Sequence, residues 1–332
     1  MKEGFIMEIH PFWNGYPELK KQLLNVDKVI NSQIRIKDKK VKAIISDVLQ
    51  SGGKLLRPAY ALLCSNIGPE REEEKATALA ASLETLHIAT LIHDDVIDRA
   101  DTRRGKATLH DLHDNKFAIY AGDYLFSVCF SILSKYSSSL SSIAYNSRSM
   151  EKILGGELEQ LHSRFQPPKS VKNYLSRISG KTAQLFALSC YVGAVESKAS
   201  KREIRRAWNM GHYIGMAYQI TDDILDYQGD GEKMGKPVMN DAGQGIFTLP
   251  LIYAMQHDPD AVSAILNKGN NFTNQDLDQL MICIERAKGI EKAQEIARRY
   301  TEKALQQLSK LPDGDYKETL YELTNQLLKR TT

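Results

Sequence analysis

Residues 76–98 read ATALAASLETLHIATLIHDDVID, and this stretch decides the fold class. Leu79, Leu83, Leu86 and Thr90 recur at steps of three and four residues, which is the spacing of one face of an α-helix. The stretch closes on two adjacent aspartates and a third three residues later. It therefore predicts a helix that carries a cluster of carboxylates near its C-terminal end.

Helical spacing also dominates the rest of the chain. The segments that show it are 117–134, 146–164, 171–195, 201–227, 245–257, 276–286 and 291–311. No pair of alternating β-branched runs flanks an Asn-Gly or Asp-Gly turn, so a sheet has little support. Because no linker is evident either, the sequence predicts a single all-α domain over residues 1–332.

Several boundaries between these segments carry helix start and stop signals. Ser170 follows two prolines and is a candidate N-cap for the helix that begins at residue 171. Thr273 and Asp276 have the spacing of a capping box, with Asp in place of the usual Glu. Gly105 is a candidate helix end.

Composition narrows the function. The net charge of +3 over 332 residues is too small to indicate a nucleic-acid partner. The four cysteines lie far apart in apolar stretches, without the spacing of a zinc site, which predicts buried free thiols and a cytoplasmic location. The N-terminus lacks the features of a signal peptide, and no uninterrupted apolar run approaches 18 residues, so no membrane span is predicted.

The strongest chemical signal is that the aspartate pattern occurs twice. Residues 94–98 read DDVID and residues 222–226 read DDILD. In each motif the first and last carboxylates are four residues apart, so they share a helix face, where like charges repel. Such pairs become favourable when they hold a hard cation, and Mg²⁺ is typically bound through one or two carboxylates and substrate phosphates. Two solvated acidic faces are the alternative, which the repetition in apolar helices disfavours.

Basic groups near these motifs suit a phosphorylated substrate, because guanidinium forks and ammonium groups match phosphate oxygens. They are Lys54, Arg57, Arg103, Arg104, Lys181 and Lys236. His87 lies two helical turns before Asp94 on the same face and is a further candidate ligand. Glu157 and Glu159 are candidates for reaching the metal cluster through water. His93 receives no role. No Gly-rich phosphate loop, GxSxG, HExxH or GxGxxG motif competes.

In this order the motifs resemble those of the trans-isoprenyl diphosphate synthases, or polyprenyl synthetases. The resemblance runs from about Gly52 to Leu251 and includes GGKLLRP at 52–58, Arg103-Arg104-Gly105, GDYLF at 122–126, Lys181-Thr182 and Tyr218-Gln219. It implies the isoprenoid synthase fold, a bundle of long, mostly antiparallel helices around a central cavity, usually as a dimer. It further implies a medium- or long-chain enzyme of the hexaprenyl or heptaprenyl type.

The resemblance also implies roles for single residues. Mg²⁺, three ions per site, would be held by Asp94, Asp98, Asp222, Asp223 and Asp226, and the groups central to catalysis would be Asp94, Asp95, Asp98, Lys181 and Asp222. Isopentenyl diphosphate would be held by Lys54, Arg57, His87 and Arg104. The allylic diphosphate would be held by Arg103, Lys181, Thr182, Gln219 and Lys236.

Product length is predicted from the helix of the first motif. Ala89 and Thr90, five and four residues before Asp94, are small, whereas family members with short products typically have an aromatic residue there. This predicts six or seven isoprene units grown from farnesyl or geranylgeranyl diphosphate. Phe126, Phe130 or Leu133 would form the floor of the cavity.

One departure from the family pattern bears on assembly. Many relatives have a lysine where this chain has Ile246, and relatives that work with a small noncatalytic subunit tend to lack it. A homodimer and a heteromer with such a subunit therefore both stay open. The alternatives for activity are a farnesyl or geranylgeranyl diphosphate synthase, a terpene cyclase, which generally lacks a second aspartate triplet, and a noncatalytic subunit, which typically loses a motif. A repeat scaffold has no support, because no repeat is visible.

Overall fold

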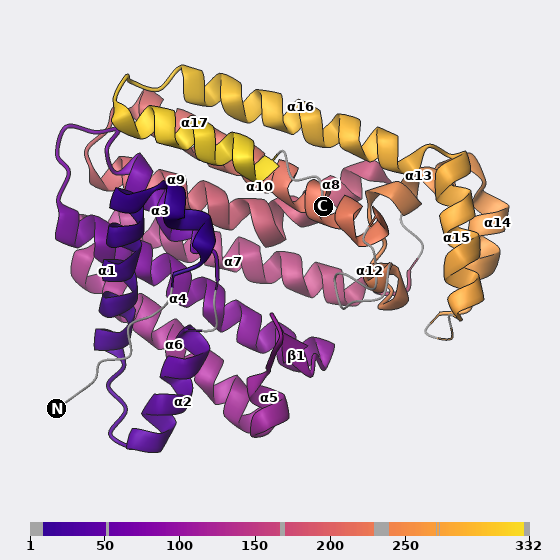
Figure 1. Cartoon of the computed structure of the whole chain (residues 1–332), viewed down its shortest axis with the longest axis horizontal. Coiled ribbons are helices and arrows are strands. Elements are labelled where there is room, and N and C mark those ends of the chain that lie inside the picture. The colour runs from indigo at the N-terminus through magenta and orange to yellow at the C-terminus, as the bar shows by residue number, and fades with distance from the viewer. Residues whose placement is uncertain are drawn as a thin grey trace. The chain divides into compact units, whose positions relative to one another are not determined.

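A computed structural model describes residues 9–50, 53–166, 170–228, 239–269, 271 and 273–328. These residues are almost entirely helical (Figure 1), which confirms the predicted all-α class. In chain order the elements are η1(Pro11–Gly15), α1(Pro17–Gln33), α2(Lys39–Leu49), α3(Leu56–Cys64), α4(Glu73–Asp98), β1(Thr102–Arg103), β2(Lys106–Ala107), α5(Leu109–Leu112), α6(Asn115–Tyr136), α7(Leu140–His162), α8(Val171–Ile178), η2(Ser179–Ala183), α9(Gln184–Glu196), α10(Lys201–Gln228), α12(Asn240–Gly243), α13(Leu249–His257), α14(Pro259–Leu266), α15(Asn274–Arg286), α16(Gly289–Ser309) and α17(Asp315–Leu328).

Contacts between residues divide the chain into two compact units. Unit 1 comprises Met1–Tyr145 and Ser189–Ile204, and unit 2 comprises Asn146–Leu188 and Arg205–Thr332. The chain passes from one unit to the other inside α7, α9 and α10. The first aspartate motif lies in unit 1 and the second in unit 2.

Unit 1 is built around α4, which packs mainly against α6 and also against α1 and α3. Every residue of α4 from Thr77 to Leu86 is buried, and apolar side chains predominate on all sides of the helix there. The exposed residues of α4 lie at its two ends, Glu73 and Glu74 at the start and Ile97 and Asp98 at the end. The first aspartate motif therefore sits at the end of a helix whose middle is held inside a core.

Helix α6 is long and apolar enough to cross a membrane by length and composition. Core helices of globular units have the same properties, and α6 buries eight residues, among them Ala118, Leu125 and Ile132. Its opposite face keeps Ile119, Tyr120 and Phe130 exposed.

Unit 2 buries one side of α10 in two apolar clusters. Ile220 and Ile224 of α10 pack in a cluster that also includes Tyr174, Ile178 and Leu249. One residue beyond the second motif, Tyr227 packs in the other cluster, to which α13, α14 and α15 also contribute. The second motif is therefore anchored from the inner side of α10.

Two predicted caps are confirmed. The Ser170 hydroxyl accepts a hydrogen bond from the backbone N–H of Asn173 at the start of α8. Thr273 and Asp276 form a capping box at the start of α15, in which each side chain accepts from the backbone N–H of the other residue.

Three local predictions were wrong. The helix expected over 171–195 is interrupted by η2, a π-helical turn, which periodicity does not reveal because both flanking helices keep apolar faces. The helix expected from residue 245 begins only at Leu249. Gly105 does not end a helix: with Arg104 it forms the two-residue turn between β1 and β2, and both have positive φ, as a type I′ turn requires.

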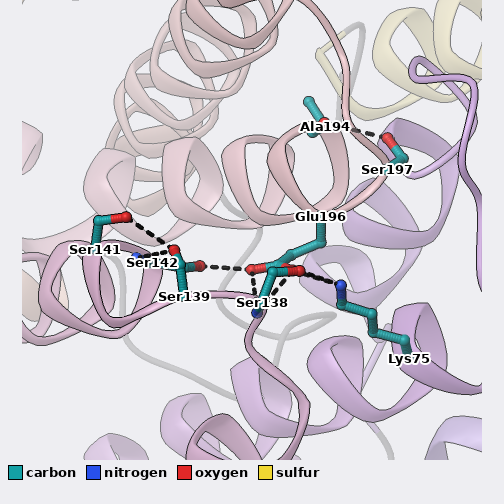
Figure 2. A network of polar contacts seen from close by, with 8 residues as sticks. All are labelled: Lys75, Ser138, Ser139, Ser141, Ser142, Ala194, Glu196 and Ser197. Atoms are coloured by element: carbon teal, nitrogen blue, oxygen red, sulfur yellow. Dashed lines mark hydrogen bonds and ion pairs between the residues drawn. The ribbon is translucent and has the colours of Figure 1, made fainter.

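A buried carboxylate ties three segments of unit 1 together (Figure 2). Glu196, at the end of α9, accepts a hydrogen bond from the Ser142 hydroxyl at 2.6 Å and from the Ser138 backbone N–H at 3.1 Å. Lys75, in the first turns of α4, forms an ion pair with Glu196 at 2.8 Å. Burial alone would raise the pKa of Glu196, but the hydrogen bonds from Lys75, Ser138 and Ser142 outweigh burial and lower it. Glu196 therefore connects the start of α4, the turn before α7 and the end of α9.

We expect Glu196→Gln to lower the free energy of unfolding by about 3 kcal/mol at pH 7, because it leaves the buried Lys75 without its charge partner. A carboxyl whose pKa is lowered by folding stabilises the protein above its unfolded pKa and loses this effect as pH falls through the folded pKa. The difference between wild type and variant in urea unfolding should therefore be constant near neutral pH and shrink below the reference value of 4.5.

Glu302→Gln is the control, because Glu302 forms an exposed pair with Arg298 and should cost less than about 1 kcal/mol. Equal losses for the two variants would show that the Glu196 network contributes little.

Candidate active site

The three aspartates of the first motif are not equivalent. Asp94 is half-buried and Asp98 is exposed, whereas Asp95 is only 7% exposed. Helix α4 ends immediately after Asp98, where Arg99 adopts the left-handed conformation. The first and last carboxylates therefore share the accessible side of the helix end, and the middle one points into unit 1.

Arg103 on β1 holds the buried carboxylate of Asp95. Its Nε donates to Asp95 Oδ1 at 2.6 Å. Burial raises the pKa of Asp95, and the charge and hydrogen bond of Arg103 offset only part of this effect. The β1–β2 hairpin, which follows α4, thus folds back so that Arg103 reaches a carboxylate of α4. Arg103 is expected to bind the allylic diphosphate, and here its guanidinium contacts Asp95.

Arg57, His87 and Arg104 form a charged cluster around the buried carboxylate of Glu84. Arg57 Nη1 lies 3.0 Å from His87 Nε2, and because a guanidinium can only donate, Nε2 accepts and the ring proton of a neutral His87 is on Nδ1. Burial and then the charge of Arg57 hold the pKa of His87 well below its usual range. The cluster brings together three of the four residues expected to hold isopentenyl diphosphate.

Glu84, which the sequence analysis missed, is the carboxylate of this cluster. Burial raises its pKa, and the nearby charges of Arg57 and Arg104 counteract the rise. The Arg104 side chain also fills the space beside Gly53, where an added Cβ would lie 2.9 Å from Nη1. The signal in the sequence was a lone acidic residue in a run of apolar ones, three residues before His87, and it is easily passed over because it belongs to no motif.

A cavity of about 520 Å³ in unit 1 opens beside this cluster. Its apolar walls come from α2, α4 and α5, and its charged lining comes from α4, the hairpin and Asp47 of α2. The residues concerned include Ile44, Val48, Ile88, Leu91, Ile92 and Leu109 among the apolar ones and Glu84, Asp95, Arg103 and Arg104 among the charged ones. An apolar body with an anionic head group has the chemistry that matches such a lining.

Lys54 is held by the N-terminal segment of unit 1. Trp13 Nε1 donates to the Lys54 carbonyl oxygen at 2.7 Å, and the Lys54 ammonium group lies 5.8 Å from the centre of the Phe12 ring. Leu55, which follows, adopts the left-handed conformation at φ 50° and caps α3. The backbone of this segment therefore depends on residues far upstream, outside the motif.

His93, which received no role from the sequence, fills the gap between α4 and α6. Its Nε2 lies 3.2 Å from the Ile119 carbonyl oxygen and 3.4 Å from Asp123 Oδ1. An added Cβ on Gly122 would lie 2.4 Å from that same Nε2. The Gly-Asp pair of the GDYLF motif thus provides the space and an acceptor for a histidine next to the first aspartates.

In unit 2 the second motif repeats the arrangement of the first. Asp222 is exposed and Asp226 half-buried, whereas Asp223 is 4% exposed. Tyr174 on α8 donates to Asp223 Oδ2 at 2.6 Å, and Gln219 Nε2 donates to Oδ1 at 2.7 Å. Burial raises the pKa of Asp223 to about 7, although both hydrogen bonds lower it.

The π-helical turn η2 carries Lys181 and Thr182. Lys181 Nζ donates to Glu157 Oε2 at 2.7 Å, and Thr182 Oγ1 donates to Gln219 Oε1 at 2.6 Å. Gly156 of α7 lies so close to the turn that an added Cβ would meet the Lys181 backbone nitrogen at 2.8 Å. Glu157, whose contact with the metal cluster through water stays a prediction, forms an ion pair with Lys181.

Asp241 on α12 is a second residue that the sequence analysis missed. Its backbone N–H donates to Asp226 Oδ2 at 3.2 Å. Burial, followed by the carboxylates of Asp223, Asp226 and Asp222, raises the pKa of Asp241 to about 8. Its sequence context carries no helical periodicity that would have placed it near the motif. Lys236, also expected here, lies outside the described residues.

The carboxylates of Asp241 and of the second motif together carry enough negative charge to suit a divalent cation. Burial contributes most to the raised pKa of Asp241, the three motif carboxylates add to it by repulsion, and a bound cation would offset that repulsion. Within the ranges that the structure describes, no three His, Cys, Asp or Glu side chains form a metal site of their own. Carboxylates that meet Mg²⁺ together with substrate phosphates do not need such a cage.

The family model for polyprenyl synthetases matches residues 38–284, which include both aspartate motifs and all the basic residues of the predicted site. The chain belongs to the polyprenyl synthetase family. It is therefore a polyprenyl diphosphate synthase, a prenyltransferase, which confirms the resemblance and the activity class predicted from the motifs. The family depends on a divalent metal.

Component 2 of heptaprenyl diphosphate synthase from Geobacillus stearothermophilus is 36% identical to this polyprenyl synthetase over 283 residues, which are 85% of this chain and 88% of the relative. The crystal structure of geranylgeranyl pyrophosphate synthase from Lactobacillus brevis matches with a TM-score of 0.91 and 38% identity, covering 96% of this chain and 99% of that one. A polyprenyl synthase from Caulobacter crescentus, in complex with calcium and isoprenyl diphosphate, has a TM-score of 0.87 and 27% identity, covering 95% and 97%.

We expect Gly122→Ala to lower the free energy of unfolding by about 2 kcal/mol, because the new methyl group overlaps the His93 ring. Urea unfolding measures the loss. His93→Ala in the same chain should restore part of it by removing the overlapping ring. If the double variant is less stable than Gly122→Ala by the full cost of His93→Ala alone, the two residues are independent and this explanation of the glycine is wrong.

Proposed function

We propose that this polyprenyl diphosphate synthase condenses isopentenyl diphosphate with an allylic diphosphate, farnesyl or geranylgeranyl diphosphate, to make a medium- to long-chain all-trans polyprenyl diphosphate. The observation that carries the proposal is the repeated aspartate motif, in which the outer carboxylates are accessible and the middle one is buried in both copies. Accessible carboxylates that share one helix face are suitable ligands for a hard cation such as Mg²⁺.

The proposed metal ligands are the outer aspartates, Asp94 and Asp98 in the first motif and Asp222 and Asp226 in the second. Asp223 was expected to join them, and its two hydrogen bonds instead support an anchoring role. Asp241 is added as a supporting carboxylate. The number of ions, three per site, stays a prediction.

Substrate binding is proposed to use two sets of residues. Lys54, Arg57, His87 and Arg104 bind isopentenyl diphosphate, and the hydrogen bond between Arg57 and His87 and the nearby charge of Arg104 support a common site. The allylic diphosphate is bound by Arg103, Lys181, Thr182, Gln219 and Lys236. The link between Thr182 and Gln219 supports the second set.

The reaction follows from charge. Bound Mg²⁺ supplies Lewis acidity toward the leaving diphosphate. Lys181 and Arg103 stabilise the same negative charge as the allylic C–O bond breaks and both electrons leave with oxygen. The double bond of isopentenyl diphosphate then forms the carbon–carbon bond, and the neighbouring carbon loses a proton to the released diphosphate. Tyr218, whose ring lies 5.5 Å from that of Phe186, offers an aromatic face to the allylic cation.

The decisive experiment incubates the purified chain alone with labelled isopentenyl diphosphate, farnesyl diphosphate and Mg²⁺, and separates the dephosphorylated alcohols by chromatography. A ladder that ends at one long alcohol supports the proposal. No incorporation with any starter, in the presence and absence of a candidate small subunit, contradicts it. A cyclised hydrocarbon would instead indicate a terpene cyclase.

Product length is proposed to be six or seven isoprene units. Ala89 is fully buried and Thr90 half-buried on α4, and neither presents a bulky side chain. On α6, Phe126 stacks near the His93 ring at 5.5 Å, Phe130 is exposed and Leu133 is buried. Phe126 and Leu133 are therefore better supported than Phe130 as a floor within the chain. The similarity to a geranylgeranyl pyrophosphate synthase keeps a shorter product as the second candidate.

We expect Ala89→Phe to shorten the main product by at least two isoprene units, because the ring closes the path along α4. Chromatography of the alcohols measures the change. Because Ala89 is fully buried and a ring there risks disturbing the core, Thr90→Phe at the half-buried neighbouring position is the second variant. An unchanged product from two folded, active variants would exclude α4 as the wall that limits chain length.

Assembly is proposed to use the exposed face of α6, which carries Ile119, Tyr120 and Phe130. Apolar and aromatic side chains at this density are typical of an interface. A second copy of the chain is the proposed partner. The absence of a lysine at Ile246 and the name "component 2" of a relative support a small second subunit as the alternative.

We expect the wild type to behave as a dimer in light scattering and Tyr120→Glu to behave as a monomer, because a charge would enter the buried centre of the interface. Tyr120 is 75% exposed in the single chain. Tyr321→Glu is the matched control, since Tyr321 is 51% exposed and belongs to another helix, α17. A monomeric wild type that becomes active only with a second subunit would favour the heteromer.

The predicted location and domain organisation are also part of the proposal. A cytoplasmic location is supported by the four cysteines, which are all free thiols. A single isoprenoid synthase domain over 1–332 is supported by the family model, which spans segments of both units.

A further inference from the structure

Tyr174 is a buried tyrosine of α8 that carries no assigned role in the reaction. Its side chain is 3% exposed, and its ring packs with Ile178, Ile220 and Leu249. The hydroxyl group donates to Asp223 Oδ2 at 2.6 Å. Apolar packing therefore determines where the ring lies, and the hydroxyl delivers one directed hydrogen bond to the second aspartate motif.

This hydrogen bond is the first of three in a chain with a defined direction. An amide nitrogen can only donate, so Gln219 Nε2 donates to Asp223 Oδ1 at 2.7 Å, while the Tyr174 hydroxyl donates to Oδ2. The Gln219 carbonyl oxygen is thereby turned the other way, where it accepts from the Thr182 hydroxyl at 2.6 Å. Asp223 therefore determines how the Gln219 amide is oriented, and through Gln219 it determines how the Thr182 hydroxyl is oriented.

We propose that Tyr174 is a positioning residue for the allylic diphosphate, acting through Asp223 on Gln219 and Thr182. The inference rests on the proposed function, in which Gln219 and Thr182 hold that diphosphate. Asp223 accepts a hydrogen bond at each of its two oxygens. This arrangement lets the second N–H of the Gln219 amide donate to an anion, and it keeps the Gln219 carbonyl oxygen turned away from that anion.

Loss of the Tyr174 hydroxyl leaves one buried oxygen of Asp223 without this donor, which is costly for a charged acceptor. The carboxylate then turns toward other donors, and the Gln219 amide loses the partner that sets its orientation. An amide rotated by half a turn would present its carbonyl oxygen to a phosphate and repel it. The defect should therefore appear in binding of one substrate only.

The test is Tyr174→Phe, which keeps the ring and its packing and removes one oxygen atom. We expect the KM for the allylic diphosphate to rise about tenfold, with the KM for isopentenyl diphosphate unchanged within twofold. A smaller fraction of folded, active enzyme would lower the apparent kcat and leave both KM values unchanged.

Tyr227→Phe is the matched control. Tyr227 is also a fully buried tyrosine of unit 2, and its hydroxyl shares a hydrogen bond of 2.8 Å with Thr248 instead of an aspartate. It should leave both KM values unchanged. Gln219→Leu provides the second control: if Tyr174 acts through Gln219, adding Tyr174→Phe to this variant should raise the allylic KM no further.

Thr182→Val keeps the inference testable if Tyr174→Phe does not fold. It breaks the far end of the same chain and should raise the allylic KM with little change in the other. The inference is overturned if Tyr174→Phe behaves as Tyr227→Phe does, or if its effect adds fully to that of Gln219→Leu. A wild type without prenyl transfer activity would instead refute the proposed function, so the two failures are distinguishable.

Discussion

The structure depends on the burial of one carboxylate in each aspartate motif. A buried carboxylate is tolerated only when donors satisfy its oxygens, and the two units meet this requirement differently. Arg103 holds Asp95 by an ion pair, whereas Tyr174 and Gln219 hold Asp223 by neutral hydrogen bonds. Once the middle aspartate points inward, helical geometry places the first and fifth on the accessible side. The shared face of like charges, unfavourable by itself, is thereby maintained in both helices.

Close packing of helices supplies the rigidity that this arrangement needs. In unit 1 the His93 ring occupies the space left by Gly122, so α4 and α6 approach each other directly beside the first motif. In unit 2 Gly156 brings α7 against η2, which carries Lys181 and Thr182. A side chain at either glycine would separate the helices and shift the groups that are proposed to bind a diphosphate. Close packing thus explains Gly122 and Gly156, whereas Gly105 is explained by the positive φ of its turn.

The helices that were predicted well are those whose pattern repeats over many turns. The helix expected over 76–97 is observed as α4, Glu73–Asp98, and the caps at Ser170 and Thr273 follow from local hydrogen bonding alone. The wrong predictions concern segments whose backbone geometry depends on residues far away in the sequence. The π-helical turn at Ser179–Ala183 packs against Gly156, and the hairpin that contains Gly105 closes so that Arg103 reaches Asp95. Neither contact leaves a trace in local periodicity.

The amino-acid sequence by itself determined the helical class, the two carboxylate motifs, the basic residues around them and the family, because each is written in residue types and short spacings. Only the tertiary structure decided which aspartate of each triplet is buried, that Glu84 and Asp241 join the charged clusters, and that His93 and Tyr174 act as supports. These properties depend on burial and on partners tens of residues away, as with Tyr174 and Asp223. Local sequence patterns do not predict which distant donor forms a hydrogen bond with a given carboxylate oxygen.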